Sequence, residues 1–459
     1  MIDLEFVLKA THGTLTNRGV DPVFEGISTD SRRIKEGELF FAIRGERYDG
    51  HDFVPAVLSN RARGAVVERG RVPAESFPHK TLIEVDGTIE ALGNLARSWR
   101  ESMPDIKLAA ITGSNGKTTT KEMTHSIVSV KFPTLKNQGN FNNDIGLPLT
   151  ILKLGRHHKR AVVEFGMNDF GEIRRLTAIA RPETGAITNI GRAHLEKLGG
   201  IEGVMRAKAE LVEEFGADNT FVVNADDPKV AEVGKRLSCT KITTGLVSKG
   251  VDVTASDIST VELSAIRVLL HLGAERVPVR IRGIGLHNVQ NALTASAIAL
   301  SLGCGPEEIQ AGLERYEPAQ MRLEIMDSPQ RFTIINDAYN ANPESMRRGL
   351  EELARLKPCG ASTIAVLGDM LELGEVSEEE HASLGEFAAS SGVDLLVAYG
   401  NYAASVVRGL DSRVDGVVAG NHDEAAEIVA EHAKPGDIVL IKGSRGMKME
   451  HIIQKIFTR

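Results

Sequence analysis

Ile111-Thr-Gly-Ser-Asn-Gly-Lys-Thr-Thr-Thr120 is the stretch of this 459-residue chain from which its fold can be worked out. The apolar run 108–111 leads into it, and a stretch with helical periodicity comes after it. Gly113 and Gly116 allow the backbone to turn tightly and to aim N–H groups at phosphate oxygens, and the following helix adds its positive N-terminal dipole. The stretch therefore predicts a strand, a phosphate-binding loop and a helix, which together grip a nucleoside triphosphate.

Individual side chains of this loop have expected roles. Lys117 is expected to reach the β and γ phosphate oxygens, and the hydroxyl of Thr118 is expected to ligate Mg²⁺. Only two residues separate the glycines, which is fewer than in the usual G-x-x-x-x-G-K-[ST] loop and narrows the candidate families. The expected nucleotide-binding residues of the loop are Gly113, Ser114, Asn115, Gly116, Lys117, Thr118 and Thr119.

Composition is that of a globular enzyme with several domains. At about 150 residues per domain, the length predicts about three domains. Asp and Glu (62) outnumber Lys and Arg (54), and the net charge of -8 argues against a nucleic-acid partner. The three cysteines are scattered, with no C-x-x-C, so neither a disulfide framework nor a zinc site is indicated. With no signal-peptide or membrane-span pattern, these features predict a cytoplasmic protein without a transmembrane segment.

Three α/β domains are expected. Residues 1–105 mix short strand-like runs with helical segments and predict a small α/β domain. Residues 106–317 carry the phosphate loop and alternate strands with helices, which predicts a mostly parallel sheet, and alternating runs within 251–282 predict an antiparallel insertion. Residues 318–459 restart the alternation and predict a Rossmann-like domain without the G-x-G-x-x-G fingerprint.

Ligands of a parallel sheet bind at the carboxyl ends of its strands. Glu164, Asn189 and Asn224 each end a predicted strand of the middle domain. His194 and Lys208 follow the second of these strands, and a carboxylate and an imidazole that converge on phosphate would suit one or two divalent cations. Each residue also has an ordinary explanation: a solvated strand end, a loop histidine and a charge on a helix surface, respectively.

Several longer motifs resemble those of the Mur ligases, the ATP-dependent enzymes that extend the peptide of peptidoglycan precursors. The resemblance runs the full length of the chain. It rests on the short phosphate loop, on Asn140-Phe-Asn-Asn-Asp-Ile-Gly-Leu-Pro and on His287-Asn-Val-Gln-Asn-Ala-Leu. It implies that Asn291 contacts adenine, and that Arg322 and Asp337 contact the phosphate and the ribose of the nucleotide.

The resemblance also assigns metal ligands. It implies that Glu164 and His194 bind Mg²⁺, with two ions expected, and that Lys208 is carbamylated. A carbamate converts an ammonium that would repel Mg²⁺ into an anionic oxygen ligand. Lys117, Glu164, His194 and Lys208 are thus the expected catalytic residues. Met321 precedes Arg322 where many relatives have glycine, which leaves the conformation of the hinge open.

Two motifs indicate a branch of the family. Asp337-Ala-Tyr-Asn-Ala-Asn-Pro-Glu-Ser-Met and Leu367-Gly-Asp-Met-Leu-Glu-Leu-Gly-Glu are similar to the branch that joins D-Ala-D-Ala to UDP-N-acetylmuramoyl-tripeptide. Ser28–Arg32 and Gly37–His51 resemble segments that bind uridine diphosphate. The substrate-binding residues that the resemblance implies are Asp30, Ser31, Arg32, Arg44, Gly45, Asn140, Asn142, Asn143, Tyr339, Asn340 and Asn342.

The implied reaction uses ATP to form an acyl phosphate, which the amine of the dipeptide then attacks. Whether the third residue of the tripeptide is lysine or diaminopimelate stays open, and the chain is expected to act as a monomer. A related ligase with another amine, such as a folylpolyglutamate synthase, is the first alternative. A nucleotide-dependent switch that forms no amide is the second.

Overall fold

The computed structural model describes residues 2–21, 23–45, 48–262 and 264–458. Glu46 and Arg47, which belong to the expected uridine-binding segment, lie outside the described residues. Two compact units make up the chain. The first unit consists of residues 1–110, 132–167 and 171–185, and the second consists of residues 111–131, 168–170 and 186–459.

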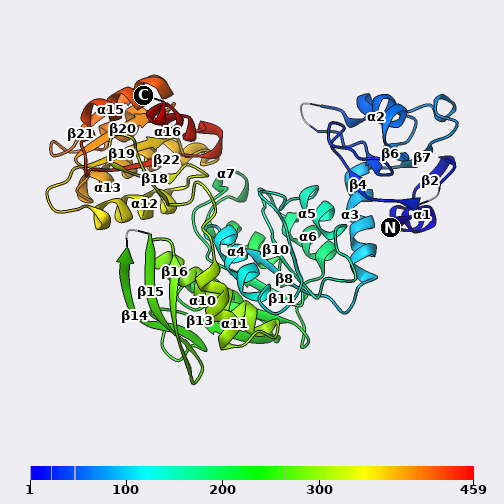
Figure 1. Cartoon of the computed structure of the whole chain (residues 1–459), viewed down its shortest axis with the longest axis horizontal. Helices are drawn as coiled ribbons and strands as arrows, with labels where there is room; N and C mark the ends of the chain where they lie inside the picture. Colours follow the sequence, from blue (N-terminus) through cyan, green and yellow to red (C-terminus); the bar gives the residue numbers. More distant parts are fainter. Residues whose placement is uncertain (1, 22, 46–47, 263, 459) are drawn as a thin grey trace. The chain divides into compact units, whose positions relative to one another are not determined.

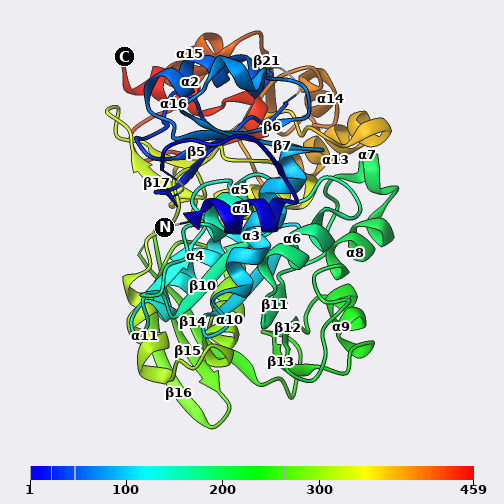
Figure 2. The same ribbon diagram turned by 90° about the vertical axis from the view of Figure 1, so that its right-hand side faces the viewer.

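The amino-terminal part of the first unit is built around a five-stranded sheet with the strand order β2-β7-β6-β5-β4. β2 runs antiparallel to β7, and the other neighbours are parallel. Helix α2 packs on one face of this sheet, and α1 and α3 pack on the other (Figure 2). Because both faces are covered, residues 64–67 of β6 are buried in succession. The elements of this part are β1 (Ile2–Asp3), α1 (Leu4–Thr11), β2 (Thr14–Asn17), β3 (Val23–Phe24), β4 (Ile27–Ser28), β5 (Leu39–Phe41), α2 (Val54–Asn60), β6 (Gly64–Glu68), β7 (Thr81–Val85) and α3 (Thr88–Glu101).

The middle segment of the chain carries a nine-stranded sheet with the order β16-β15-β14-β13-β12-β11-β8-β10-β9. The phosphate loop follows β8 and leads into α4, as the apolar run and the periodicity predict. The elements of this segment are β8 (Lys107–Thr112), α4 (Lys117–Val128), β9 (Thr134–Lys136), α5 (Gly146–Ile151), β10 (Arg160–Glu164), α6 (Glu172–Ala180), β11 (Thr184–Ile187), α7 (Leu195–Leu198), α8 (Ile201–Ala209), β12 (Thr220–Asn224), α9 (Pro228–Lys235), β13 (Thr240–Thr244), β14 (Val253–Glu262), β15 (Ala265–Leu272), β16 (Glu275–Arg282), α10 (Leu286–Ser301) and α11 (Pro306–Arg315).

The predicted antiparallel run within 251–282 is present, but it is not a separate layer. β14, β15 and β16 pair antiparallel with one another, while β14 joins the parallel strand β13 through Thr244 and Val253. These three strands therefore lengthen the central sheet at one edge.

The carboxyl-terminal part of the second unit is the predicted Rossmann-like fold. Its six-stranded sheet has the order β17-β18-β22-β19-β20-β21, and only the β17–β18 pair is antiparallel. α12 and α13 cover one face, and α15 and α16 cover the other (Figure 1). The elements are β17 (Glu324–Asp327), β18 (Thr333–Asp337), α12 (Pro343–Leu356), β19 (Thr363–Gly368), α13 (Ser377–Ser390), β20 (Leu395–Tyr399), α14 (Ala403–Arg408), β21 (Asp415–Ala419), α15 (His422–His432), β22 (Ile438–Lys442) and α16 (Glu450–Phe457).

The connection into this part has an unusual backbone. Met321 and Leu323, on either side of Arg322, have φ angles of 58° and 51°. These values lie in the left-handed region, which glycine adopts most readily and which explains why glycine suits position 321. The carbonyl oxygen of Met321 accepts a hydrogen bond from the N–H of Tyr339 at 3.2 Å, so this conformation is tied to the end of β18.

Within the described ranges, we find no helix whose length and hydropathy would let it cross a membrane.

Candidate active site

The phosphate loop has the glycine conformations that its sequence predicts. Gly113 has a φ of 149° and Gly116 a φ of 80°, and Lys117 begins α4 directly afterwards. A Cβ atom on Gly113 would lie 1.9 Å from the hydroxyl oxygen of Thr188, so position 113 has no room for a side chain. The two glycines are therefore required by backbone conformation and by close packing.

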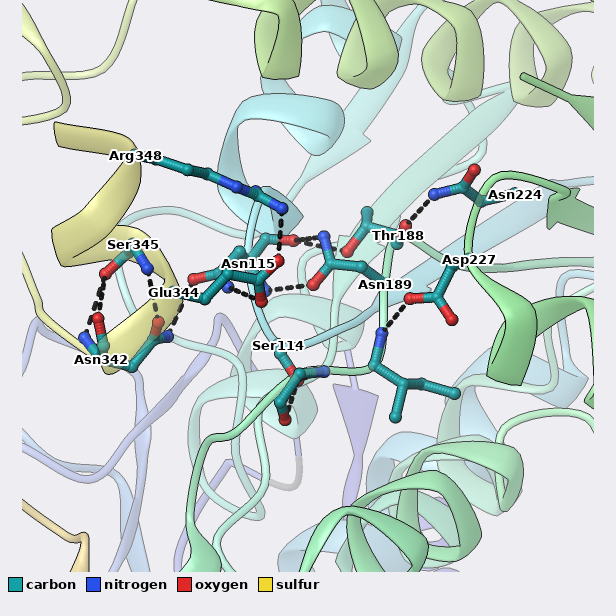
Figure 3. A network of polar contacts seen from close by, with 12 residues as sticks. Ser114, Asn115, Thr188, Asn189, Asn224, Asp227, Asn342, Glu344, Ser345 and Arg348 are labelled. Atoms are coloured by element: carbon teal, nitrogen blue, oxygen red, sulfur yellow. Dashed lines mark hydrogen bonds and ion pairs between the residues drawn. The ribbon is translucent and has the colours of Figure 1, made fainter. Parts of the chain in front are cut away.

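Strand β11 and the residues after it hold the loop from one side (Figure 3). The side-chain oxygen of Asn189 accepts from the N–H of Asn115 at 2.9 Å, and the side-chain nitrogen of Asn189 donates to the carbonyl of Asn115 at 3.0 Å. The hydroxyl of Thr188 donates to the same carbonyl, and the side chain of Asn224 in turn donates to the carbonyl of Thr188 at 2.8 Å. Asn189 and Asn224, which end predicted strands, thus brace the phosphate loop.

A pocket of about 120 Å³ lies beside the loop within the second unit. The ammonium of Lys117, which lines it, donates to the carbonyl of Gly113 at 2.8 Å. The pocket brings together residues that are far apart in the sequence. Its polar lining includes Ser114, Lys117, His194, Asn340, Asn342, Glu372, Ser444 and Arg445.

His194 lies in this pocket next to a carboxylate. Its Nδ1 atom is 2.7 Å from Oε2 of Glu372, although the two atoms are not aligned for a well-formed hydrogen bond. The imidazole of His194 holds the pKa of Glu372 below its usual range. Both residues have left-handed backbones, with φ angles of 55° and 66°. Strained backbone of this kind is concentrated at functional sites.

Lys208 is almost fully buried near the end of α8. Burial, and then the positive charge of Lys117, hold the pKa of Lys208 well below its usual range. The alternative of an ordinary charge on a helix surface is therefore wrong for this residue. A buried lysine that loses its proton easily has the nucleophilic amine from which a carbamate forms.

Glu164 lies in the first unit, at the end of β10, and is buried rather than a solvated strand end. Its Oε1 atom accepts from the side-chain nitrogen of Asn142 at 3.0 Å. Its backbone N–H donates to the side chain of Asn137 at 2.9 Å. Asn143 uses its side-chain oxygen to accept from the N–H of Gly146 at the start of α5. Of the asparagines in this motif, Asn142 is therefore the one that contacts the predicted metal ligand.

Asn140, the first residue of this motif, is exposed, and its carbonyl accepts from the N–H of Asn142 at 2.8 Å. It does not contact the carboxylate of Glu164 through any hydrogen bond that the described residues show.

Asn291 packs against the phosphate loop from α10. Its side-chain oxygen accepts from the hydroxyl of Thr120 at 3.3 Å, and a Cβ atom on Gly116 would lie 2.4 Å from the same oxygen. Thr119 is buried in the same turn of α4. The predicted adenine-binding residue is thus close to the loop.

Arg322 connects the carboxyl-terminal part to α4. Its Nη2 atom donates to the hydroxyl of Thr118 at 3.0 Å, and its guanidinium lies 4.2 Å from the centre of the Tyr339 ring. The Nε atom of Arg322 is buried with no hydrogen-bond partner among the described residues. A guanidinium whose buried Nε–H has no partner is suited to a phosphate oxygen.

Asp337 ends β18 and pairs with a buried lysine. The ammonium of Lys442 contacts Oδ2 of Asp337 and also donates to the carbonyl of Asn340 at 3.1 Å. Oδ1 of Asp337 accepts from the N–H of Leu323 at 3.2 Å. Lys442 therefore fixes both the predicted ribose ligand and the loop that carries Asn340.

The residues of the expected uridine site lie in the loops that follow β4 and β5. Two guanidinium nitrogens of Arg32 donate to the carboxylate of Asp30 at 2.9 Å, and the Arg32 side chain is exposed. Ser31 lies between them. Arg44 forms an isolated bridge with Asp49, and the N–H of Gly45 donates to the carbonyl of Tyr48 at 2.9 Å.

Several residues of the site have no sequence signal of their own. Glu372 lies in a motif that indicates the family branch but not a role. Lys442 ends the last strand, β22, and Arg445 follows that strand, outside the motifs described above. Glu344 belongs to a motif that indicates the family branch. Its local signal is that of an acidic residue in the first turn of a helix, which predicts a favourable helix end but no contact with the phosphate loop.

Comparison with known proteins agrees with this arrangement. Three family models match: "Mur ligase family, catalytic domain" over residues 23–100, "Mur ligase middle domain" over residues 111–299, and "Mur ligase, glutamate ligase domain" over residues 321–445. The middle model covers the phosphate loop, His194, Lys208 and Asn291. The third covers Arg322 and, except for Gly446, the lining of the pocket from the carboxyl-terminal part.

Whole proteins are similar over nearly the full chain. A UDP-N-acetylmuramoyl-tripeptide–D-alanyl-D-alanine ligase of Bacillus subtilis is 34% identical over 98% of this chain and 97% of its own length. The ligase of the same name from Escherichia coli is 32% identical over 96% and 95%.

Solved structures agree in fold. A crystal structure of MurF from Acinetobacter baumannii superposes with a TM-score of 0.91 at 35% identity and covers 100% of this chain and 99% of that one. A MurF ligase of Thermotoga maritima in complex with ADP has a TM-score of 0.83 at 27% identity, over 95% and 98% of the two chains. The resemblance that the motifs indicate is confirmed, and the chain belongs to the Mur ligase family.

Proposed function

We propose that this chain is an ATP-dependent ligase that joins D-Ala-D-Ala to UDP-N-acetylmuramoyl-tripeptide and so forms an amide bond in peptidoglycan precursor synthesis. The observation that carries the proposal is the pocket beside the phosphate loop. In it, Lys117 and His194 of the middle segment share one cavity with Asn340 and Arg445 of the carboxyl-terminal part. The names of the relatives that match the full chain support the same reaction.

The first step transfers the γ-phosphoryl group of ATP to the terminal carboxylate of the tripeptide. The bond between the β–γ bridging oxygen and the γ-phosphorus breaks, ADP leaves, and an acyl phosphate forms. Lys117 and the amino-terminal end of α4 stabilise the negative charge on the transferred group. Arg322, whose Nε atom has no partner among the described residues, supplies a further donor toward phosphate.

In the second step the amine of D-Ala-D-Ala attacks the acyl carbon, loses a proton and expels inorganic phosphate. Asn340 and Arg445 supply an amide and a guanidinium to the pocket and suit the carboxylate of the dipeptide. Tyr339, Asn340 and Asn342 are the dipeptide-side residues of the proposal. Enclosure of the pocket would protect the acyl phosphate from hydrolysis.

The proposal includes Mg²⁺. Thr118, Glu164, His194 and a carbamate on Lys208 are the residues that would hold it, and they offer the oxygen and imidazole donors that divalent cations accept. When bound, the ion neutralises phosphate charge. The burial and the lowered pKa of Lys208 support the carbamate, because the neutral amine is the form that adds to carbon dioxide.

The remaining residues divide between the nucleotide and the uridine substrate. For ATP the proposal includes the phosphate loop from Gly113 to Thr119, with Asn291 for adenine and Asp337 for ribose. For the uridine substrate the proposed residues are Asp30, Ser31, Arg32, Arg44, Gly45, Asn140, Asn142 and Asn143. We assign these roles to three domains, 1–105, 106–317 and 318–459, of a cytoplasmic monomer.

The test is phosphate release from ATP with each substrate alone and with both together, using UDP-muramoyl-tripeptides that carry lysine or diaminopimelate. Release that requires both the tripeptide and D-Ala-D-Ala supports the ligase. Release that needs neither substrate indicates a nucleotide switch, and release supported better by another amine indicates a different ligase of the family.

A further inference from the structure

The amino-terminal turn of α12 holds the phosphate loop from the side opposite β11 (Figure 3). The side-chain nitrogen of Asn342 donates to Oδ1 of Asn115 at 2.8 Å. The side-chain nitrogen of Asn115 donates to Oε2 of Glu344 at 3.1 Å. Both ends of one loop amide are therefore bonded to a helix more than two hundred residues later in the chain.

Asn115 is thus fixed at its backbone and at its side chain. The side chain of Asn189 forms hydrogen bonds with the backbone N–H and the carbonyl of Asn115. Asn342 and Glu344 form hydrogen bonds with the oxygen and the nitrogen of the Asn115 side-chain amide, respectively. An asparagine that is bonded on all of these groups cannot change its rotamer or its backbone angles without breaking several hydrogen bonds. The residue lies between Gly113 and Gly116, so its position decides the shape of the loop between the two flexible points.

Asn342 is itself held in place by the start of α12. It caps α12, because its side-chain oxygen accepts from the N–H of Ser345 at 2.9 Å, and the hydroxyl of Ser345 accepts from the N–H of Asn342 at 3.0 Å. With the oxygen used by the cap and the nitrogen used by Asn115, the amide acts as a connector between the helix and the loop.

Glu344 is held in place in a similar way. Arg348, one turn further along α12, forms an ion pair with Oε1 of Glu344 at 2.5 Å. A Cβ atom on Gly191 would lie 2.3 Å from Oε2, so the carboxylate reaches Asn115 only because residue 191 has no side chain. The φ angle of Gly191 is not in the left-handed region, so alanine could adopt its backbone.

We propose that Glu344 and Asn342 are positioning residues for the phosphate loop. When the start of α12 docks on Asn115, it sets the loop in the shape that receives the triphosphate, and the carboxyl-terminal part thereby controls phosphoryl transfer. The kinetic consequence rests on the proposed ligase function, whereas the effect on the loop itself does not.

The first experiment therefore measures the loop without substrates. Hydrogen exchange of the peptide that covers residues 111–120 is compared in wild type, Glu344→Ala and Gly191→Ala. Glu351→Ala is the matched control, because Glu351 is an exposed carboxylate on the same helix. We expect exchange of the loop peptide to rise about tenfold in the first two variants and to be unchanged in the control. Unchanged exchange in both Glu344→Ala and Gly191→Ala overturns the proposal, whatever the enzyme does.

The second experiment measures kinetics in a double-mutant cycle. Asn115→Ala and Glu344→Ala are each expected to lower kcat/KM for ATP about tenfold or more, and the double variant is expected to be no worse than Asn115→Ala alone. Glu344→Gln, which keeps an oxygen acceptor, is expected to recover part of the loss. Additive losses would overturn the proposal. A wild-type enzyme without ligase activity would instead refute the proposed function and leave the exchange result to stand.

Discussion

Arg322 donates a hydrogen bond from Nη2 to the hydroxyl of Thr118 at 3.0 Å, and so connects the carboxyl-terminal part to the helix that begins with the phosphate-loop lysine. The same guanidinium lies 4.2 Å from the centre of the Tyr339 ring. A planar cation that is stacked on one side and bonded at its edge has a single orientation. Its Nε atom is buried and has no hydrogen-bond partner among the described residues.

Substitution of Arg322 by lysine should weaken ATP binding although the charge is kept. Lysine has neither the planar face that stacks on Tyr339 nor the forked donors. We expect KM for ATP to rise about tenfold or more, a loss of about 1.4 kcal/mol, as measured by steady-state phosphate release. Arg315→Lys, the same change at an exposed arginine outside the proposed site, serves as the control. A KM for ATP in Arg322→Lys equal to that of wild type would contradict the role.

Removal of the ammonium of Lys117 should affect the chemical step. Because this group stabilises charge that develops on the transferred phosphoryl group, Lys117→Ala should lower kcat by about 10²-fold or more. Single-turnover measurements with saturating ATP separate this effect from binding. Lys153→Ala, a change at an exposed lysine, is the control. Turnover near the wild-type rate in Lys117→Ala would rule out the assignment.

Lys208 should carry a carbamate in the active enzyme. Exchange with ¹³C-labelled carbon dioxide should give one carbamate resonance in wild type that is absent from Lys208→Ala. That variant should be nearly inactive, and short-chain carboxylates should restore part of its activity by supplying the missing anionic oxygen. Lys117→Ala should not be rescued by the same additives. An unlabelled Lys208 together with no rescue would refute the modification.

Amine selection should favour the dipeptide strongly. Asn340 and Arg445 offer donors to a carboxylate, and a single amino acid cannot place both its amine and its carboxylate correctly. D-Ala-D-Ala should therefore support phosphate release at least about 10²-fold better than D-Ala, L-Lys or diaminopimelate. Equal turnover with a single amino acid would overturn the proposed substrate but not the ligase mechanism.

Acid should destabilise the loop that follows β5 through Asp49. The N–H of His51 donates to this carboxylate at 3.0 Å and is the main reason that its pKa falls from 3.8 to about 2. The folded state thus prefers the charged carboxylate, so the stabilisation is complete above the unfolded pKa near 4 and is lost as the pH falls toward 2. Asp49→Asn should flatten the dependence of unfolding free energy on pH in this window, by about 1 kcal/mol. Urea unfolding of both proteins between pH 4.5 and 2.5 measures it, and identical slopes would contradict the role of Asp49.

Much of the fold could be predicted because its strands are buried on both faces and read as short apolar runs. Residues 161–163 of β10 and 438–441 of β22 are examples. β21 was not predicted, because this edge strand begins with Asp415 and Gly416, and most of its residues are at least partly exposed. β17 is similarly short and half-buried. Such strands form because the neighbouring strand of the sheet offers backbone hydrogen bonds, and their own residues lack the apolar pattern that predicts a strand.

The candidate site likewise contains residues that could be predicted from the sequence and residues that could not. The loop from Gly113 to Thr118 has a local pattern whose chemistry can be read from residue types and spacing. The contacts of Glu344 and Glu372 cannot be read from a local pattern, because their partners Asn115 and His194 are distant in the sequence and come close only through tertiary packing. The burial of Lys208 was likewise invisible, since its neighbours on α8 read as an ordinary amphipathic helix.

The left-handed backbone of Met321 and Leu323 stores conformational strain in the connection between the middle and carboxyl-terminal segments. Each side chain held in this conformation costs about 1–2 kcal/mol, which would be released if the backbone rotated away. The hydrogen bonds of Met321 to Tyr339 and Glu324 hold the backbone in this strained conformation. Glycine at position 321 would remove part of that strain. With methionine there, the release of strain favours rotation of the backbone out of the left-handed conformation once those hydrogen bonds break.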